Sequence, residues 1–341
     1  MRSRRNTILF VSLFCTACLF FLIDILTGSV HIPLVDIVQI FLGNTPADDA
    51  YSIIIIQTRL PKSLTAVAVG AGLPVAGLLM QTYFRNPVAG PDILGISAGS
   101  GLFVAIVMLG AGNILAASVF YNVSVIFAAI VGAVCMLLII LTVARKTKDN
   151  ITLLMFAIFF GMAVSAVVGI LQFYSDKGDL KLFILWTFGS LGGVTWQQLT
   201  VLLPVIIVCC LLTFLLAKRL NVLLIGEKYA KNLGLHIRHT TLVIILLTAL
   251  ITGAVTAFCG PVAFIGLAVP HAARMLFKTS DHSILIPASI LTGISILLFC
   301  DVLTQMAAAG VVLPLNSITA LMGAPFVIYI LWKNYKMQYF F

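Results

Sequence analysis

The sequence predicts an all-α polytopic membrane protein with about ten transmembrane helices, on three observations. Of its 341 residues, 61% are hydrophobic and 9% are charged, with a mean hydropathy of +1.17. So few polar side chains cannot cover a water-soluble globule of this size. Apolar stretches long enough to cross a bilayer also recur along the whole chain. Finally, the basic residues are distributed unevenly between the two sets of loops that these stretches define.

The apolar stretches define the expected spans in order. A spanning helix needs about 20 apolar residues, because its backbone must form hydrogen bonds internally where no water is present. Stretches of this kind lie at 7–27, 62–81, 93–110, 115–143, 151–173, 196–217, 240–258, 261–273, 284–305 and 315–332. The first follows three arginines, as a secretory signal does, but it is long and lacks an A-x-A cleavage site. We therefore expect one transmembrane domain over 1–341.

The basic residues indicate which loops face the cytoplasm. With the N-terminus inside and ten spans, most of the 20 lysines and arginines fall on the inner side, as the positive-inside rule requires. Those expected outside are Arg59, Lys62, Lys177 and Lys181. The net charge of +9 is therefore attributed to membrane orientation with both termini cytoplasmic, and no nucleic-acid partner is expected.

Three connections carry polar residues in recognisable patterns. The outer segment 28–60 is expected to hold short surface helices, and the outer segment 175–193 either a short extracytoplasmic helix or a plain connector anchored by Trp186. The longest inner loop, 218–240, contains Gly226 to Gly234, which has the pattern of a short helix bracketed by glycines. A knob of this kind could be gripped by a partner protein.

The inner connection between the second and third spans, FRNPVAGPDILGIS, is expected to form a stiff turn. Pro87 and Pro91 cannot continue a helix, Arg85 follows the positive-inside rule, and Asp92 suits the N-terminal end of the next span. The turn residues singled out are Arg85, Asn86, Pro87, Pro91 and Asp92.

Other chemistry is sparse. The seven cysteines lie within or at the ends of apolar runs, and the five histidines form no metal-binding pattern, so no metal site is expected. Ionisable residues inside the spans are chiefly Asp24 and Asp301, fewer than an ion-driven carrier generally needs. The chain has no G-x-x-x-x-G-K-[ST] loop, so any ATP is expected to bind another polypeptide.

Several motifs occur in order between about residues 50 and 335. They are RLPK at 59–62, GAGLPVAG at 70–77, Gln81, RNP at 85–87, PDILGIS at 91–97, Trp186 with GSL at 189–191, LIGEKYA at 224–230, GPVAFIGL at 260–267, PHAAR at 270–274, DH at 281–282, Asp301, LP at 313–314 and GAP at 323–325. This pattern resembles the FecCD-type permease family of bacterial ABC importers for iron-siderophores, haem and vitamin B12.

The resemblance implies a type II ABC importer bundle in the bacterial inner membrane. It implies a homodimer with two ATPase subunits below, which bind ATP and Mg²⁺, and an extracytoplasmic substrate-binding protein above. Residues implied in ATPase coupling are Gly226, Glu227, Lys228, Tyr229, Ala230, Lys231, Gly234, His271 and Arg274, and those implied in docking of the binding protein are Arg59, Lys62 and Gln305. Expected pathway-lining residues are Phe156, Phe160, Gly161 and Gln172. This chain itself would catalyse no reaction and hold no cofactor, and the resemblance selects none of the three chelates.

The chain departs from the family pattern on the outer side. Lys62 stands in place of an arginine, which keeps the charge but loses the bidentate fork. Gln305 stands where the family often has a further arginine, and residues 312–316, VLPLN, replace a segment that carries a glutamate and a glycine. These departures concern the outer docking surface.

Two competing functions are weighed against the importer. An ion-driven secondary carrier is one alternative. The other is an intramembrane serine hydrolase, because Gly95 to Gly99 matches G-x-S-x-G and His271 could serve as the base for Ser97. That chemistry needs the serine held on an elbow in a polar pocket, whereas Ser97 is expected at a helix start among small packing residues.

Overall fold

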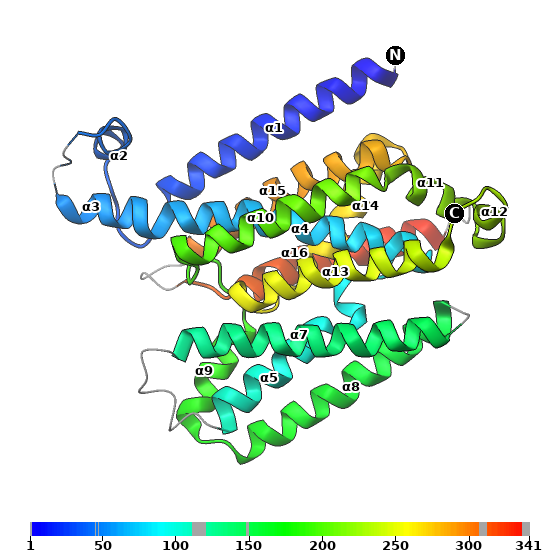
Figure 1. The fold of residues 1–341 in the computed structure, drawn as a ribbon. Helices are drawn as coiled ribbons and strands as arrows, with labels where there is room; N and C mark the ends of the chain where they lie inside the picture. The colour runs from blue at the N-terminus through cyan, green and yellow to red at the C-terminus, as the bar shows by residue number, and fades with distance from the viewer. Residues whose placement is uncertain are drawn as a thin grey trace.

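The computed structural model describes residues 2–44, 46, 48–110, 121–147, 150–306 and 312–335, and within these it is helical with no strand. The side chains of residues 2, 3, 121, 122, 150, 227, 228 and 330–335 lie outside the description. The elements are α1 (Arg2–Leu26), α2 (Leu34–Phe41), α3 (Asp49–Ile53), a π-helical turn η1 (Ile54–Arg59), α4 (Leu60–Phe84), a 3₁₀ turn η2 (Pro91–Leu94), α5 (Ile96–Gly110), α7 (Tyr121–Lys146), α8 (Asn150–Tyr174), α9 (Lys177–Thr187), α10 (Trp196–Leu215), α11 (Ala217–Ile225), α12 (Glu227–Asn232), α13 (Ile237–Cys259), α14 (Ile265–Phe277), α15 (His282–Gln305) and α16 (Leu315–Tyr335) (Figure 1).

The all-α membrane fold is confirmed, although the expectation of about ten full-length spans was slightly high. In the described part of the chain, seven helices are long and apolar enough to cross a bilayer. Three further predicted spans correspond to shorter apolar stretches of helix, Ile96–Gly110, Ile265–Phe277 and Leu315–Tyr329. Two of these helices begin later than predicted, at Ile96 instead of residue 93 and at Ile265 instead of residue 261, because residues 91–94 form η2 and residues 260–264 run as a loop into α14.

Helix α4 is the central element of the bundle. It is almost entirely buried and packs against α10, α13, α14 and α15. The packing depends on glycine: a Cβ at Gly293 would lie 2.1 Å from the carbonyl oxygen of Gly70, and one at Gly77 would lie 1.6 Å from that of Gly266. Helices approach this closely in a bilayer through small residues, because apolar side chains are no better solvated by a neighbouring helix than by lipid.

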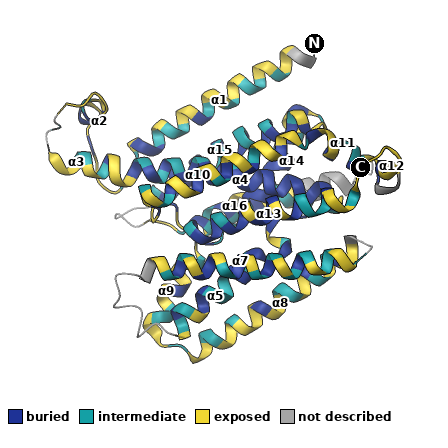
Figure 2. Cartoon of the chain, viewed as in Figure 1, coloured by how far each residue is buried: buried dark blue, intermediate teal, exposed yellow. Residues whose placement is uncertain are grey.

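A second group of helices, α5, α7, α8 and α9, lies on one side of α4, and α1 lies on the opposite side (Figure 1). α5 crosses α7 at a close approach of Gly99 and Gly132. Exposed side chains follow the outer faces of α1 and α8 (Figure 2), and these are large apolar residues, as expected of helices that face lipid or another membrane helix.

The loops sort to two ends of the bundle. The N-terminal ends of α1 and α8, the C-terminal ends of α7 and α16, and α12 lie at one end, and α2, α3 and α9 lie at the other (Figure 1). We call these the inner and outer ends. The predicted short helices in 28–60 and 175–193 are confirmed as α2, α3 and α9.

Candidate functional site

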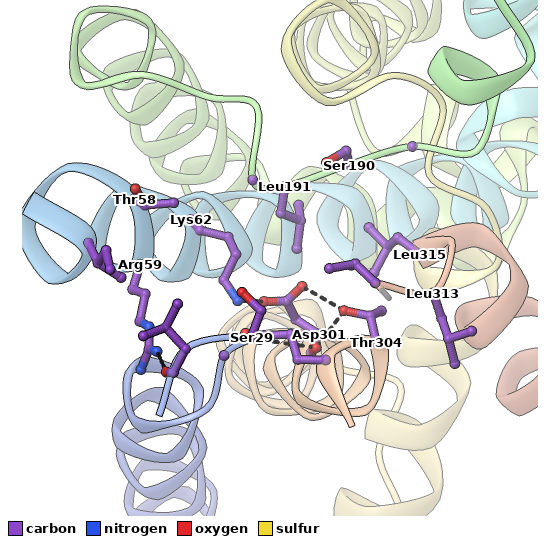
Figure 3. Close-up of a pocket in the computed structure, with 17 residues that line it drawn as sticks. Ser29, Thr58, Arg59, Lys62, Ser190, Leu191, Asp301, Thr304, Leu313 and Leu315 are labelled. Carbon is purple, nitrogen blue, oxygen red and sulfur yellow. Dashed lines mark hydrogen bonds and ion pairs between the residues drawn. The ribbon is translucent and has the colours of Figure 1, made fainter. Parts of the chain in front are cut away.

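The outer end contains a cavity of about 320 Å³ between segments far apart in the sequence (Figure 3). One wall is the connection that follows α1, and the opposite wall is the glycine-rich segment between α9 and α10. The lining residues are Gly28, Ser29, Val30, Ile54, Thr58, Arg59, Lys62, Gly189, Ser190, Leu191, Gly192, Asp301, Thr304, Gln305, Val312, Leu313 and Leu315. This outer pocket includes all three residues predicted for outer docking.

Lys62 joins three helices at the base of the outer pocket. Its ammonium lies 2.8 Å from Asp301 Oδ2 on α15 and 3.3 Å from Asp24 Oδ1 on α1. Asp24 is completely buried and also accepts hydrogen bonds from Ser63 Oγ at 2.5 Å and Gln305 Nε2 at 3.0 Å. Buried carboxylates need partners of this kind because they have left water. The cluster therefore ties α1, α4 and α15 together at their outer ends.

Arg59 also holds the outer end of α1, through hydrogen bonds to backbone carbonyl oxygens. Its guanidinium donates to the carbonyl oxygens of Ile25 at 2.9 Å and Leu26 at 3.0 Å, and also to that of Val30. The last carbonyls of a helix have no partner within the helix, so a cation at the C-terminal end of α1 satisfies them and complements the helix dipole.

Arg59 and Lys62 make these contacts within the chain, whereas the sequence predicted that they receive acidic groups of an outer binding protein. Arg59 is 4% exposed and Lys62 is held by two carboxylates, so neither charge is free at the surface of this chain. In the sequence, Asp24 and Asp301 stand out as ionisable residues inside the spans, but nothing in the sequence indicates that they pair with Lys62. Gln305 also points inward, to Asp24. Docking of an outer partner against this region stays a prediction.

Asn316, at the start of α16, holds the far wall of the outer pocket in place. Its Nδ2 donates to the carbonyl oxygens of Thr187 at 2.9 Å and Pro261 at 2.8 Å, and its Oδ1 accepts from the backbone N–H of Ala263 at 3.0 Å. The start of α16 is therefore fixed to the loops that follow α9 and α13. The signal that could have found it is a lone amide at the head of an apolar run.

At the inner end, the predicted stiff turn is confirmed. α4 ends at Phe84, and Arg85 adopts the left-handed conformation with φ 49°. Asn86 Oδ1 accepts from the backbone N–H of Val88 at 3.0 Å, and Pro91 begins η2. Asp92 accepts a hydrogen bond from Ser97 Oγ at 2.6 Å, which joins the turn to the first residues of α5.

His271 and Arg274 of α14, predicted to assist ATPase coupling, contact this turn and the last part of α4, respectively. His271 Nε2 donates to the carbonyl oxygen of Pro87 at 2.6 Å. Arg274 Nη1 donates to Gln81 Oε1 at 2.9 Å, and Gln81 Nε2 donates to the carbonyl oxygen of Leu267 at 3.1 Å. As placed, the two residues position the end of α4.

The predicted knob in the inner loop is present as α12, flanked by Gly226 and Gly234 at φ 129° and 83°. Ala230 is buried against the bundle, whereas Tyr229 and Leu233 are each 66% exposed and Lys231 is also exposed. The side chains of Glu227 and Lys228 lie outside the described part of the chain. The knob thus presents an aromatic and an aliphatic side chain to the surroundings.

A network around Asn221, which sequence reasoning missed, anchors α11 just before the knob. Asn221 Oδ1 accepts from the backbone N–H of His282 at 2.8 Å and from its Nδ1 at 2.7 Å, and Asn221 Nδ2 donates to Asp281 Oδ1 at 2.7 Å. The other ring nitrogen of His282 lies 2.8 Å from Thr82 Oγ1 on α4. Arg85 Nη2 adds a bond to the carbonyl oxygen of Leu223 at 3.1 Å. α11 is therefore fixed to both α4 and α15.

The expected pathway-lining residues lie on α8 but are not brought together at one site. Phe156 and Phe160 stack with ring centroids 5.6 Å apart, and both pack partly against the core. Gly161 lines a second cavity of about 450 Å³ with Asp92, Gly95 and Ser165, among others. Gln172 is half-buried near the outer end of α8. Their role in a pathway stays a prediction.

The geometry does not favour the serine hydrolase. Ser97 Oγ donates to Asp92 and lies 3.3 Å from Thr256 Oγ1, while His271 is bonded to the carbonyl oxygen of Pro87. Each residue of the supposed pair has other partners, so no activated serine results. Among the described residues, no group of three or more His, Cys, Asp or Glu side chains could hold a metal ion.

A family model, curated relatives and a solved structure each match most of this chain. Residues 16–333 match the model of the FecCD transport family. The haemin transport system permease protein HmuU of Yersinia pestis is 36% identical over 301 residues, 87% of this chain and 88% of the relative. The vitamin B12 import system permease protein BtuC of Salmonella arizonae is 36% identical over 283 residues, 82% of each chain. A solved inward-facing metal-chelate-type ABC transporter has 26% identity and a TM-score of 0.82, covering 95% of this chain and 98% of the other.

Proposed function

The chain belongs to the FecCD transport family, and from this premise we propose that it is the membrane permease subunit of an ATP-driven importer of haem, cobalamin or related metal chelates. The observation that carries the proposal is the 36% identity to a haemin permease and to vitamin B12 permeases, each over more than four fifths of both chains. The fold supports it, because a metal-chelate-type ABC transporter superposes on 95% of this chain.

The complex that we propose is a homodimer of this chain in the bacterial inner membrane, with both termini cytoplasmic. Two ATPase subunits bind ATP and Mg²⁺ at the inner end, and a substrate-binding protein delivers the chelate at the outer end. The grouping of the α1 start, α12 and the α16 end at one end of the bundle supports this orientation, since that end carries most of the basic residues.

In the proposed complex, α12 is the contact to the ATPase. Tyr229 and Leu233 support this role because they are large side chains exposed at the inner end, outside the spans. Large apolar side chains that are exposed together outside a membrane often mark a protein interaction site. Tyrosine is also common at the centre of protein interfaces.

The connections of α11 suggest how movement of α12 would reach the outer end. Asn221 and Arg85 fix α11 to α15 and α4, and these two helices cross without a gap at Gly70 and Gly293. At the outer end, Lys62 of α4 is paired with Asp301 of α15. A displacement of the knob would therefore move α4 and α15 as one unit and reshape the outer pocket.

Reconstituted transport tests the proposal. The chain is co-purified with the ATPase and binding protein encoded beside it and placed in liposomes, and uptake of haemin and of cyanocobalamin is measured. We expect uptake of at least one of the two to require ATP, the ATPase and the binding protein together. Uptake that persists without the ATPase and follows a proton or sodium gradient would instead establish a secondary carrier.

A further inference from the structure

Helix α2 shows an unusual burial pattern for a segment outside the spans. Its eight residues, LVDIVQIF, bury Asp36, Ile37 and Ile40 and leave large apolar side chains outward. The exposed set is Leu34, Val35, Val38, Phe41 and the following Leu42, exposed by 63, 67, 55, 55 and 71%. Water-facing helices normally place polar residues on that face, so a contiguous apolar surface of this kind marks a contact that the isolated chain lacks.

The helix is fixed in place by its buried face. Ile37 and Ile40 join a small core with Ile25 from the end of α1 and Ile55 from η1. Figure 1 shows α2 almost end-on, whereas the spanning helices run across the view, so α2 lies crosswise to them at their outer end. A helix perpendicular to the spans at this level lies along the plane of a bilayer surface.

Helix α1, which comes just before α2 in the chain, also exposes apolar side chains of the kind expected to face lipid or another membrane helix. The outward side chains of α1 just before it, Leu19, Leu22 and Leu26, are exposed by 55, 58 and 39%, on a hydrophobic helix that packs against the bundle along one side. Ile25 of α1 and Ile37 and Ile40 of α2 belong to one small buried core, so the exposed leucines of α1 and the exposed face of α2 both lie near this outer end.

The chemistry of the face selects lipid over a protein partner. Protein interfaces combine aromatic and arginine anchors with a polar rim. The outward face of α2 carries four aliphatic residues and one phenylalanine, its carboxylate Asp36 is buried, and Gln39 is half-buried. We propose that α2 is an interfacial anchor whose apolar face inserts into the headgroup and acyl boundary of the outer leaflet.

An anchored α2 has a consequence for the outer pocket. Residues 27–33 connect α1 to α2, and within them Gly28, Ser29 and Val30 form one wall of the pocket. Val30 also accepts a hydrogen bond from Arg59. The bilayer surface would therefore hold this wall at a set depth while α4 and α15 move.

Spin-label accessibility tests the anchor in the full chain in phospholipid nanodiscs, in a background lacking the exposed Cys15 and Cys18. A label replaces Val38, and in a second variant Val35, both outward-facing so that no internal contact is lost. Labels at Leu22 on the lipid face of α1 and at Tyr229 on α12 are the membrane and water controls. We expect collision with oxygen to exceed collision with a water-soluble nickel chelate several-fold at Val38, as at Leu22.

Two other outcomes would overturn the proposal. Accessibility at Val38 and Val35 like that of Tyr229 would place α2 in water. Exclusion of both reagents would mean that protein, such as a second copy of this chain, covers the face. Photolabelling of the unmodified protein with a bilayer-soluble diazirine provides the variant-free check: the peptide containing residues 34–42 must be labelled, and the one containing 227–232 must not. Neither measurement depends on what the chain transports.

Discussion

Replacing Lys62 by methionine should destabilise the protein strongly. Methionine keeps the length of the side chain but removes the ammonium that lies 2.8 Å from Asp301 and 3.3 Å from Asp24. Both carboxylates are buried, so neither can regain water where it stands. Removing one partner of a buried ion pair costs about 3–5 kcal/mol, because the remaining charge is left uncompensated.

The two carboxylates should not contribute equally to this cost. Asp24 keeps its hydrogen bonds from Ser63 and Gln305, and such bonds to a charged group are worth about 1.5–3 kcal/mol each. Asp301 Oδ2 has no hydrogen-bond donor besides the ion pair with Lys62 among the described residues. Most of the loss should therefore come from Asp301, and the double variant Lys62→Met with Asp301→Asn should recover at least half of it.

The assay is unfolding in detergent, followed by circular dichroism against temperature and against the mole fraction of sodium dodecyl sulfate. Lys181→Met is the matched control, since Lys181 is an exposed lysine on α9 at the same end of the molecule. It should change stability by less than about 0.5 kcal/mol. A loss below about 1 kcal/mol for Lys62→Met, or a further loss on adding Asp301→Asn, would refute the idea that this ion pair joins α1, α4 and α15.

Three further predictions concern the inner end and the core. Asn221→Ala leaves two donors of His282 without an acceptor, which should cost about 2–4 kcal/mol and lower chelate uptake per ATP hydrolysed several-fold in the reconstituted complex. Gly77→Ala places a methyl group 1.6 Å from a carbonyl oxygen of α14, so gel filtration should show little monodisperse protein. Hydrogen bonds from Asn221 and from a backbone N–H lower the pKa of Asp281, so its contribution to stability is present above the unfolded pKa of about 3.9 and is lost as pH falls through the folded pKa. Unfolding midpoints should therefore decline less between pH 6 and pH 3 in Asp281→Asn.

Matched variants make these predictions specific. Ser295→Ala removes a buried hydroxyl of α15 that bonds to Leu291 of its own helix at 2.9 Å and to Leu13 of α1 at 3.5 Å, with no partner on α11. It should leave uptake per ATP unchanged, and a loss of uptake equal to that of Asn221→Ala would contradict the role given to Asn221. Gly101 has nothing within 4 Å of an added Cβ, and Gly101→Ala should yield normal protein. If the unfolding midpoint of Asp281→Asn falls as steeply between pH 6 and pH 3 as that of the unmodified chain, the prediction is wrong and other carboxylates cause the loss of stability in acid.

Much of the fold could be predicted from the sequence because hydropathy is a local property. Each apolar stretch forms a helix wherever it occurs in a bilayer, since no other local structure bonds its backbone there. Proline and glycine likewise determined the turn after Phe84 and the knob between Gly226 and Gly234. The starts of α5 and α14 were placed too early in the chain, because 3₁₀ turns and loops buried in protein can be as apolar as helix.

The candidate site was predicted less well because its partners are distant in the sequence. Lys62 is 38 residues from Asp24 and more than 200 from Asp301, and nothing near RLPK shows that its cations turn inward. Asn221 and Asn316 appeared to be ordinary polar residues, yet Asn221 joins α11 to the start of α15, and Asn316 joins the start of α16 to two other segments. Such pairings become visible only when the helices are packed.

By itself, the sequence determined the membrane environment, the helical class and the motifs that place the chain in its family, and it predicts the sidedness of the loops. Each of these follows from composition and short spacing, because a bilayer selects segments by apolar length and loops by charge. Only the tertiary structure showed which charged groups are buried and paired within the protein, which glycines allow α4 to contact its neighbours, and which apolar face of α2 is exposed. These depend on which helices meet, since a buried charge or an exposed leucine is defined only by what lies beside it.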